Sequence, residues 1–223
     1  MKAYEYNRIK YLTFDLINVY HSVNDKATVE AVYAQTVAEI EELSKAKEVG
    51  DFLERIADSK TTKEQAERDL LHLKNLVEPF ALPSESQIKK IFKKVKKLKV
   101  PAQASWDMKE LTYFAWNEIS SQRKYIVTSD GRGFYGTTSG SIKNICAICQ
   151  KTSQVTQFLA TTKRGSDGTY TKNGTYICVD SVNCNRQMQK IEGLEHFLEI
   201  IKERGATLQK TDKSDRIKTL NEE

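Results

Sequence analysis

The sequence predicts an α+β fold, with an N-terminal antiparallel helical bundle followed by a mixed α/β domain. In the first 78 residues, apolar side chains recur every three or four positions, the period of an amphipathic helix. All three prolines lie between residues 79 and 101 and separate this part from the rest. Beyond them, short apolar segments alternate with Asp-Gly and Asn-Gly pairs, which are typical of β-hairpin turns.

The N-terminal domain, assigned to residues 1–80, begins with two amphipathic helices. The first is predicted over residues 4–20, where an apolar stripe leaves the charged side chains for solvent. The second follows Asn24 or Asp25, since either side chain can accept a hydrogen bond from the first turn of a helix. Both helices expose their apolar stripe unless they pack against other elements.

Two further helices complete this domain. A short one is predicted after Gly50, and another begins at the capping box formed by Thr62 and Gln65 and continues until Pro79 blocks it. Because no amphipathic helix can bury its stripe alone, an antiparallel bundle of the four is the most economical packing.

The second domain, assigned to residues 81–204, begins with a basic connecting helix over residues 84–99. Pro83 and the capping-box pattern after it start this helix, and Pro101 ends it. From Ile88 onward, one side is apolar and the rest carries seven lysines and no acidic residue. The pattern fits either the solvated face of a packed helix or a contact surface for phosphate or acidic groups. Because lysine is a compact charge, any nucleic-acid contact there would be nonspecific.

The remainder of this domain reads as an aromatic cluster, several β-strands and one last helix. The aromatic residues from Trp106 to Trp116 are interpreted mainly as core. The strand candidates cover residues 124–128, 134–138, 155–161, 169–171 and 175–177. Helical spacing then predicts a helix from Val182 to Arg204, which Gly205 stops, and the polar residues 205–223 are expected to form a mobile tail.

Composition and charge narrow the class of protein. No run reaches the roughly 18 apolar residues that a membrane span needs, and no apolar signal-peptide core follows Met1. We therefore expect a cytoplasmic protein whose thiols stay reduced. Residues 1–78 hold 11 basic and 15 acidic side chains and the remainder 24 and 15, so the C-terminal part carries about nine excess positive charges. Such a part favours a negatively charged partner, nucleic acid or protein.

The chain has four cysteines, Cys146, Cys149, Cys178 and Cys184, and they predict one structural zinc ion. The first two form a Cys-x-x-Cys knuckle, the third ends a predicted strand, and the fourth begins the last helix. Two disulfides would require export. A redox pair would lie in a βαβ unit rather than between hairpins. A catalytic zinc would keep one position open for water, whereas four thiolates fill the shell.

A search for other chemistry predicts no enzyme. His21, His72 and His196 are isolated on predicted helices, and each is interpreted as a surface or satisfied histidine. Asp107 and Asp180 have no catalytic partner and are interpreted as capping or loop residues. No nucleophile elbow or phosphate-binding glycine loop is present in the sequence.

With these elements in place, the sequence resembles the FusB-type fusidic acid resistance proteins, also called elongation factor G-binding proteins. The resemblance covers residues from about 5 to 204. It rests on the motifs Phe80-Ala-Leu-Pro-Ser84, Ile91-Phe-Lys-Lys-Val-Lys-Lys97, Trp116-Asn-Glu, Arg123-Lys-Tyr-Ile126, Cys146-x-x-Cys149, Ser166-Asp-Gly-x-Tyr170, Tyr176-Ile-Cys178, Asp180-Ser181 and Cys184-Asn185. It implies a helical bundle followed by an α/β domain with a treble-clef-like Cys₄ zinc finger.

The resemblance also implies a function. Such proteins bind elongation factor G through the zinc-finger domain and promote its release from the ribosome, including when fusidic acid has trapped it there, without modifying the drug. The matching contact positions are Tyr176, Phe197 and Lys172, while Ile145 and Asn173 depart from the phenylalanine and lysine of relatives. We expect a monomer without membrane contact. The alternative is a ribosomal RNA-binding protein that uses the lysine-rich helix and the zinc finger.

Overall fold

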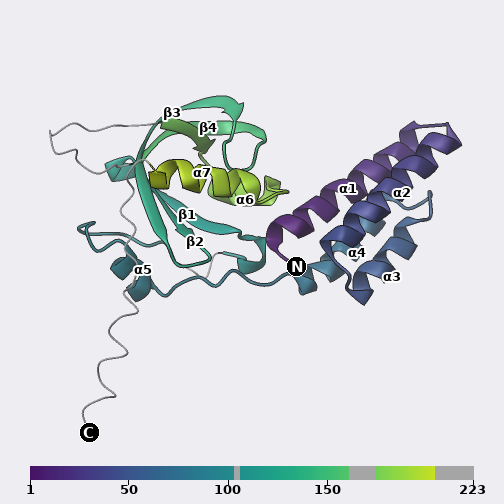
Figure 1. The fold of residues 1–223 in the computed structure, drawn as a ribbon, viewed down its shortest axis with the longest axis horizontal. Coiled ribbons are helices and arrows are strands. Elements are labelled where there is room, and N and C mark those ends of the chain that lie inside the picture. The colour runs from purple at the N-terminus through teal and green to yellow at the C-terminus, as the bar shows by residue number, and fades with distance from the viewer. Residues whose placement is uncertain (103–105, 161–173, 204–223) are drawn as a thin grey trace, which may run out of the picture.

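The computed structural model describes residues 1–102, 106–160 and 174–203. The first four helices are α1 (Ala3–Ser22), α2 (Lys26–Leu43), α3 (Lys47–Ile56) and α4 (Lys63–Leu73), and they pack into the bundle that the sequence predicts (Figure 1). Their apolar stripes meet in one core that includes the fully buried Ile9, Leu16, Ile40, Phe52 and Ile56. The short 3₁₀ helix η1 (Lys74–Leu76) then leads into the connection.

Helix capping follows the sequence, but two boundaries do not. Asp25 caps α2 by accepting a hydrogen bond from the backbone of Thr28 at 2.9 Å. Thr62 and Gln65 form their reciprocal capping box. The predicted start of the third helix after Gly50 is wrong, because α3 begins at Lys47 and contains this glycine. The fourth helix was also expected to continue towards Pro79, whereas α4 gives way to η1 six residues before it.

The basic connecting helix is shorter than predicted. Helix α5 covers Glu85–Ile91 and begins at the expected capping box of Ser84, but it does not continue to residue 99. The backbone of Phe92 leaves helical geometry, with φ of −104° and ψ of 35°, and its ring packs 5.3 Å from the ring of Tyr125. Burial of this aromatic side chain on the sheet stabilises the chain more than the last turns of an exposed, lysine-rich helix would.

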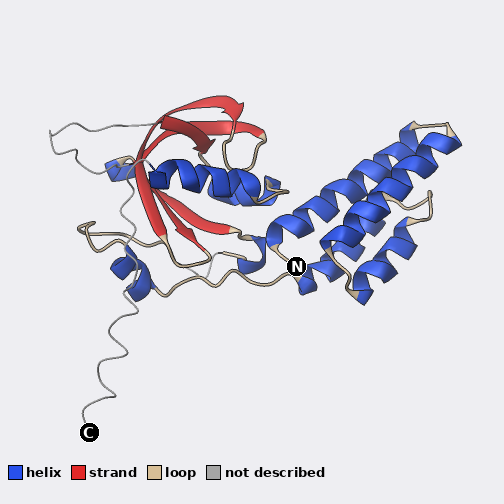
Figure 2. Cartoon of the chain, in the orientation of Figure 1, coloured by secondary structure: helices blue, strands red, loops and turns tan. Residues whose placement is uncertain are grey.

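Within the described residues, five antiparallel strands form one sheet in sequential order: β1 (Tyr113–Glu118), β2 (Arg123–Thr128), β3 (Gly133–Ile145), β4 (Thr152–Ala160) and β5 (Gly174–Cys178) (Figure 2). The 3₁₀ helices η3 (Met108–Glu110) and η4 (Ile119–Ser121) precede and follow β1. The aromatic cluster is confirmed, with Trp106 and Phe114 rings 5.0 Å apart, but the sequence missed that this region forms β1. The candidate at 169–171 lies outside the described residues.

The predicted last helix is two helices, α6 (Ser181–Gln187) and α7 (Glu192–Glu203). The chain turns between them at Met188, whose backbone is extended. The first turn of α7 then crosses the Cys-x-x-Cys knuckle so closely that a Cβ on Gly193 would lie 2.3 Å from the carbonyl oxygen of Ile148. A continuous helix could not make this approach. The predicted tail, residues 205–223, lies outside the described residues.

The two faces of the sheet carry different layers. Phe114, Trp116, Tyr125 and Val127 pack against α5 in one core. Tyr113, Ala115 and Ile126 point to the other face, where they form a second core with the four cysteines and with α6 and α7. Figure 1 shows α7 lying within the curve of the sheet and α5 beyond β1 and β2.

The helical bundle contacts the second domain through the N-terminal part of α1. The Asn7 side chain donates hydrogen bonds to the carbonyl oxygens of Asn185 and Met188, at 2.8 and 2.9 Å, at the end of α6. The Lys74 ammonium pairs with Glu110 at 2.7 Å and with Asp107 at 2.8 Å. The Asn7 contacts tie the bundle to the helix that carries Cys184, and the Lys74 ion pairs tie it to η3.

Candidate metal centre

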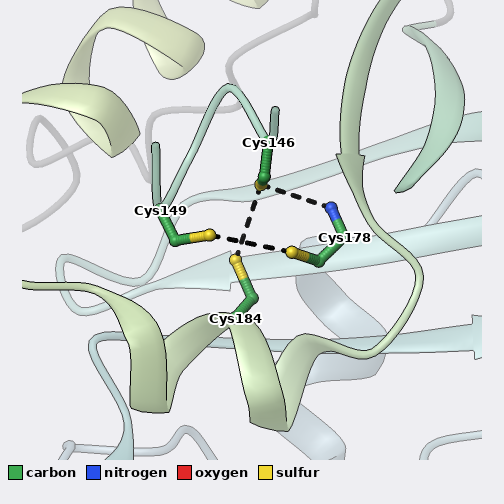
Figure 3. Close-up of side chains that lie close together, drawn as sticks. All are labelled: Cys146, Cys149, Cys178 and Cys184. Atoms are coloured by element: carbon green, nitrogen blue, oxygen red, sulfur yellow. Dashed lines mark hydrogen bonds between the residues drawn. The ribbon is translucent and has the colours of Figure 1, made fainter. Parts of the chain in front are cut away.

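Three elements bring the four cysteines together. Cys146 and Cys149 lie in the tight turn between β3 and β4, where Gln150 adopts a positive φ of 60°. Cys178 is the last residue of β5, and Cys184 lies in α6. Asp180 starts this helix by accepting hydrogen bonds from the backbones of Val182 and Asn183, which confirms its predicted capping role. All four side chains point to one centre (Figure 3).

The sulfur atoms have the separation that a tetrahedral zinc site requires. The four Sγ atoms lie within 4.8 Å of one another, with Cys146 and Cys184 separated by 3.8 Å and Cys149 and Cys178 by 3.7 Å. A tetrahedral ion with Zn–S bonds of about 2.3 Å places its sulfurs roughly 3.8 Å apart. All four side chains are buried, so the cluster is closed to solvent, as a structural site should be.

The surrounding backbone favours thiolate at this centre. The N–H groups of Ile148 and Cys178 point at the Sγ of Cys146, with N···S distances of 3.4 and 3.3 Å. Hydrogen bonds from Cys149, Cys178 and Cys184 hold the pKa of the Cys146 thiol well below its ordinary value. Donors aimed at sulfur stabilise the negative form that binds a metal. The residues present therefore fit zinc, which would cross-link the knuckle, β5 and α6.

Two polar residues behind the cluster belong to motifs that carry the family resemblance, but neither was assigned a structural role from the sequence. Asn185 is fully buried, and its side chain accepts hydrogen bonds from the backbones of Thr112 and Tyr113 while donating to the carbonyl oxygens of Tyr113 and Ser181. It thereby fastens α6 to the start of β1. No spacing rule distinguishes this asparagine from one on a helix surface.

Lys124 is the second such residue. Its side chain is fully buried, and Nζ donates to the carbonyl oxygen of Val179 at 2.9 Å and to Oδ1 of Asn117 at 3.1 Å. Burial lowers the pKa of Lys124 to about 8, and the nearby cysteine sulfurs oppose that shift. In the sequence, Lys124 looked like an ordinary residue at the start of a strand.

The expected partner contacts divide into exposed and buried residues. Ile145 is 60% exposed and directly precedes Cys146, and Tyr176 is 38% exposed on β5. The backbone N–H of Ala147 donates to the carbonyl oxygen of Tyr176 at 2.8 Å, so the backbone of β5 at Tyr176 adjoins the knuckle that Ile145 precedes. We call Ile145 and Tyr176 the knuckle patch.

Phe197 does not belong to this patch, and its burial gives no support to its expected role as a direct partner contact. Its side chain is fully buried in the core under the sheet, and its ring meets that of Phe158 at 5.6 Å. Aromatic side chains beside small metal sites often serve as core, because such domains have little other apolar volume. Lys172 and Asn173 lie outside the described residues. His21, His72 and His196 are exposed, as interpreted from the sequence.

The chain forms a helical bundle followed by an antiparallel sheet, and a knuckle, a strand end and a helix supply its four thiols. This arrangement defines a zinc-finger protein of the treble-clef type. Residues 1–81 match the family model "Elongation factor G-binding protein, N-terminal", and residues 86–219 match "FBP C-terminal treble-clef zinc-finger". The chain belongs to the FusB-type family of elongation factor G-binding proteins, and its four cysteines form a structural zinc site.

A solved structure agrees with this assignment. The chain is similar to the one described as "Structure of the fusidic acid resistance protein FusC", with 39% identity and a TM-score of 0.83 over 89% of this chain and 96% of that chain. No curated protein sequence matches the chain significantly. Within the described residues, no helix is long and apolar enough to cross a membrane.

Proposed function

We propose that this protein binds elongation factor G through the knuckle patch and promotes its release from the ribosome, thereby protecting translation from fusidic acid. The observation that carries the proposal is the exposure of Ile145 and Tyr176 beside a rigid metal centre. Large apolar side chains held by a fixed backbone are typical of the residues that dominate binding energy at protein interfaces. The family membership supports elongation factor G as the partner, and the similarity to the fusidic acid resistance protein FusC supports the link to the drug.

The proposed mechanism needs no covalent step. A protein that binds the free or departing conformation of its target more tightly than the ribosome-bound one lowers the bound population by differential affinity alone. The chemical structure of fusidic acid would not change. Mass spectrometry of the drug after incubation with the protein should therefore show only the starting compound. A modified product would contradict this part of the proposal.

The binding experiment uses the zinc-loaded full chain and purified elongation factor G. Calorimetry should give a complex of about one to one, and the double variant Ile145→Ala/Tyr176→Ala should weaken it by about 2 kcal/mol, roughly thirtyfold in Kd. Ile119→Ala is the matched control, because Ile119 is 90% exposed in η4, between β1 and β2. Unchanged affinity in the double variant would show that the contact surface lies elsewhere.

Release requires its own measurement. Ribosomes carrying labelled elongation factor G and fusidic acid should lose the label faster when the protein is added, and the double variant should lose this effect in proportion to its weaker binding. Tight binding in solution without faster loss from the ribosome would leave the partner correct and the release step wrong.

A further inference from the structure

The proposed binding surface leaves the lysine-rich segment after residue 88 unused. This lysine segment, residues 88–99, carries Lys89, Lys90, Lys93, Lys94, Lys96, Lys97 and Lys99, and all seven side chains are exposed. Lys89 pairs with Glu85 at 2.6 Å. Within the described part of the chain, no ion pair engages the other six. Six like charges without acidic partners repel one another. An anion that binds among them reduces this repulsion and therefore lowers the free energy of the segment.

The backbone under these charges is held firmly. Ile88 is fully buried, and the Phe92 ring packs 5.9 Å from Trp116 and 6.2 Å from Tyr135. A Cβ on Gly133 would lie 2.2 Å from Cγ2 of Ile91, so the segment contacts the start of β3 directly. The chain continues as turns after α5 and reaches a positive φ of 58° at Lys97. The lysines therefore extend from a fixed platform rather than from a loose linker.

The sequence leaves two anionic partners open for this surface, nucleic acid and acidic protein, and the side chains that the surface presents favour nucleic acid. The large apolar side chains exposed within the described residues are Tyr11, Leu71, Ile119, Ile142, Ile145 and Tyr176, and none belongs to the lysine segment. Protein interfaces are depleted in lysine and use aromatic or aliphatic anchors, which this surface does not offer. Lysine ammonium groups act as point charges that neutralise phosphates, and they need no such anchors.

We propose that the lysine segment is a binding site for the phosphate backbone of RNA. Because it presents no arginine, asparagine or exposed aromatic side chain, it would bind RNA with little base preference. Its apolar side packs on the sheet face formed by Phe114, Trp116 and Tyr125, whereas the cysteines and α7 lie on the opposite face. The protein could therefore hold RNA and a protein partner at once.

The experiment measures binding of the zinc-loaded full chain to a fluorescein-labelled poly(U) RNA of about 20 nucleotides, longer than the roughly 4–16 nucleotides of a single-strand site. Fluorescence anisotropy is recorded at several KCl concentrations without elongation factor G. Each phosphate contact contributes roughly 0.7 to the slope of log K against log salt. Replacing Lys90, Lys93, Lys94 and Lys96 with glutamine should lower that slope by up to about 3 and raise the Kd about tenfold or more at low salt.

Two matched variants keep the result specific. Glutamine at Lys26, Lys45, Lys47 and Lys60 removes the same charge from exposed positions in the helices and loops of the N-terminal bundle and should leave the RNA affinity nearly unchanged. Arginine at the four segment positions should retain binding. Because all these side chains are exposed, zinc content and melting temperature should stay the same, and both are measured to exclude misfolding.

Two outcomes would overturn the proposal. Equal loss of RNA affinity in both glutamine variants would mean that only net charge matters. Unchanged RNA binding in the segment variant, combined with weaker binding of a polyglutamate peptide or of elongation factor G, would identify the segment as a contact for acidic protein instead. Since the assay omits elongation factor G, its result does not depend on the proposed function.

Discussion

The buried ammonium group of Lys124 donates a hydrogen bond of 2.9 Å to the carbonyl oxygen of Val179, the residue after the zinc ligand Cys178. Asn117 supports the same carbonyl with a second donor, also at 2.9 Å. Four thiolates around one zinc dication carry a net negative charge, and burial makes that charge costly unless a cation lies nearby. Lys124 is placed to balance it from behind the ligands.

Lys124→Met should therefore weaken zinc binding. Loss of a supporting residue behind a metal ligand typically lowers metal affinity tenfold to a hundredfold, and we expect a change of about that size. Competition with a chromophoric chelator measures the affinity. Lys143→Met, which removes an exposed lysine from β3, is the control. Equal zinc affinity in both variants would show that the buried charge does not act on the metal.

Removal of the metal should abolish binding of elongation factor G. The zinc ion joins the knuckle next to Ile145, the strand that carries Tyr176, and α6, so its loss should disorder the knuckle patch. Near-ultraviolet circular dichroism reports the disorder, and calorimetry reports the binding. A chelated, demonstrably zinc-free protein that still bound the factor would contradict this account.

Asn185→Ala should destabilise the zinc-finger domain by on the order of 3 kcal/mol, because it leaves buried backbone groups at Thr112, Tyr113 and Ser181 without their partner. Urea denaturation followed by circular dichroism gives the free energy of unfolding. Asn183→Ala, two residues earlier on the same helix, is the control. The prediction fails if the two variants lose similar stability.

Phe197 and Tyr176 should respond to alanine in opposite ways. Phe197→Ala empties a fully buried site and should cost about 3–5 kcal/mol of stability. Tyr176→Ala should change stability by less than about 1 kcal/mol and mainly weaken partner binding. Thermal unfolding and calorimetry on both variants separate these effects. Weak binding by Phe197→Ala at a temperature where it remains fully folded would restore Phe197 as a contact.

Acid should weaken the contact between the two domains at Glu110. Burial opposes ionisation of this carboxyl, but hydrogen bonds from Lys74 and Arg186 hold the pKa of Glu110 below its ordinary value of 4.5. A lowered pKa contributes stability that is present above pH 4.5 and is lost as the pH falls through the folded-state value.

The corresponding variant is Glu110→Gln, which should cost about 1 kcal/mol at pH 7. The difference in melting temperature from the unchanged protein should then shrink below pH 4.5. Glu199→Gln, at an exposed position of α7, should show neither effect. A difference that stays constant with pH would rule out the ion pairs as its source.

The sequence determined the features that depend on neighbouring residues. Capping boxes at Thr62 and Ser84, the cap at Asp25 and the amphipathic stripes of the bundle are local, because a helix begins where a side chain can bind its free N–H groups. The zinc ligands could also be recognised from the sequence, since a Cys-x-x-Cys knuckle followed by two further cysteines is typical of a structural zinc site.

Only the tertiary structure decided which side chains are inside. Phe197, Lys124 and Asn185 lie fully buried, although the family resemblance implied that Phe197 contacts the partner and the sequence assigned no buried role to Lys124 or Asn185. Helix α5 ends at Ile91 because the Phe92 ring packs on the sheet, which is formed by residues distant in the chain. Burial depends on what packs against a residue, and that partner has no fixed spacing in the sequence.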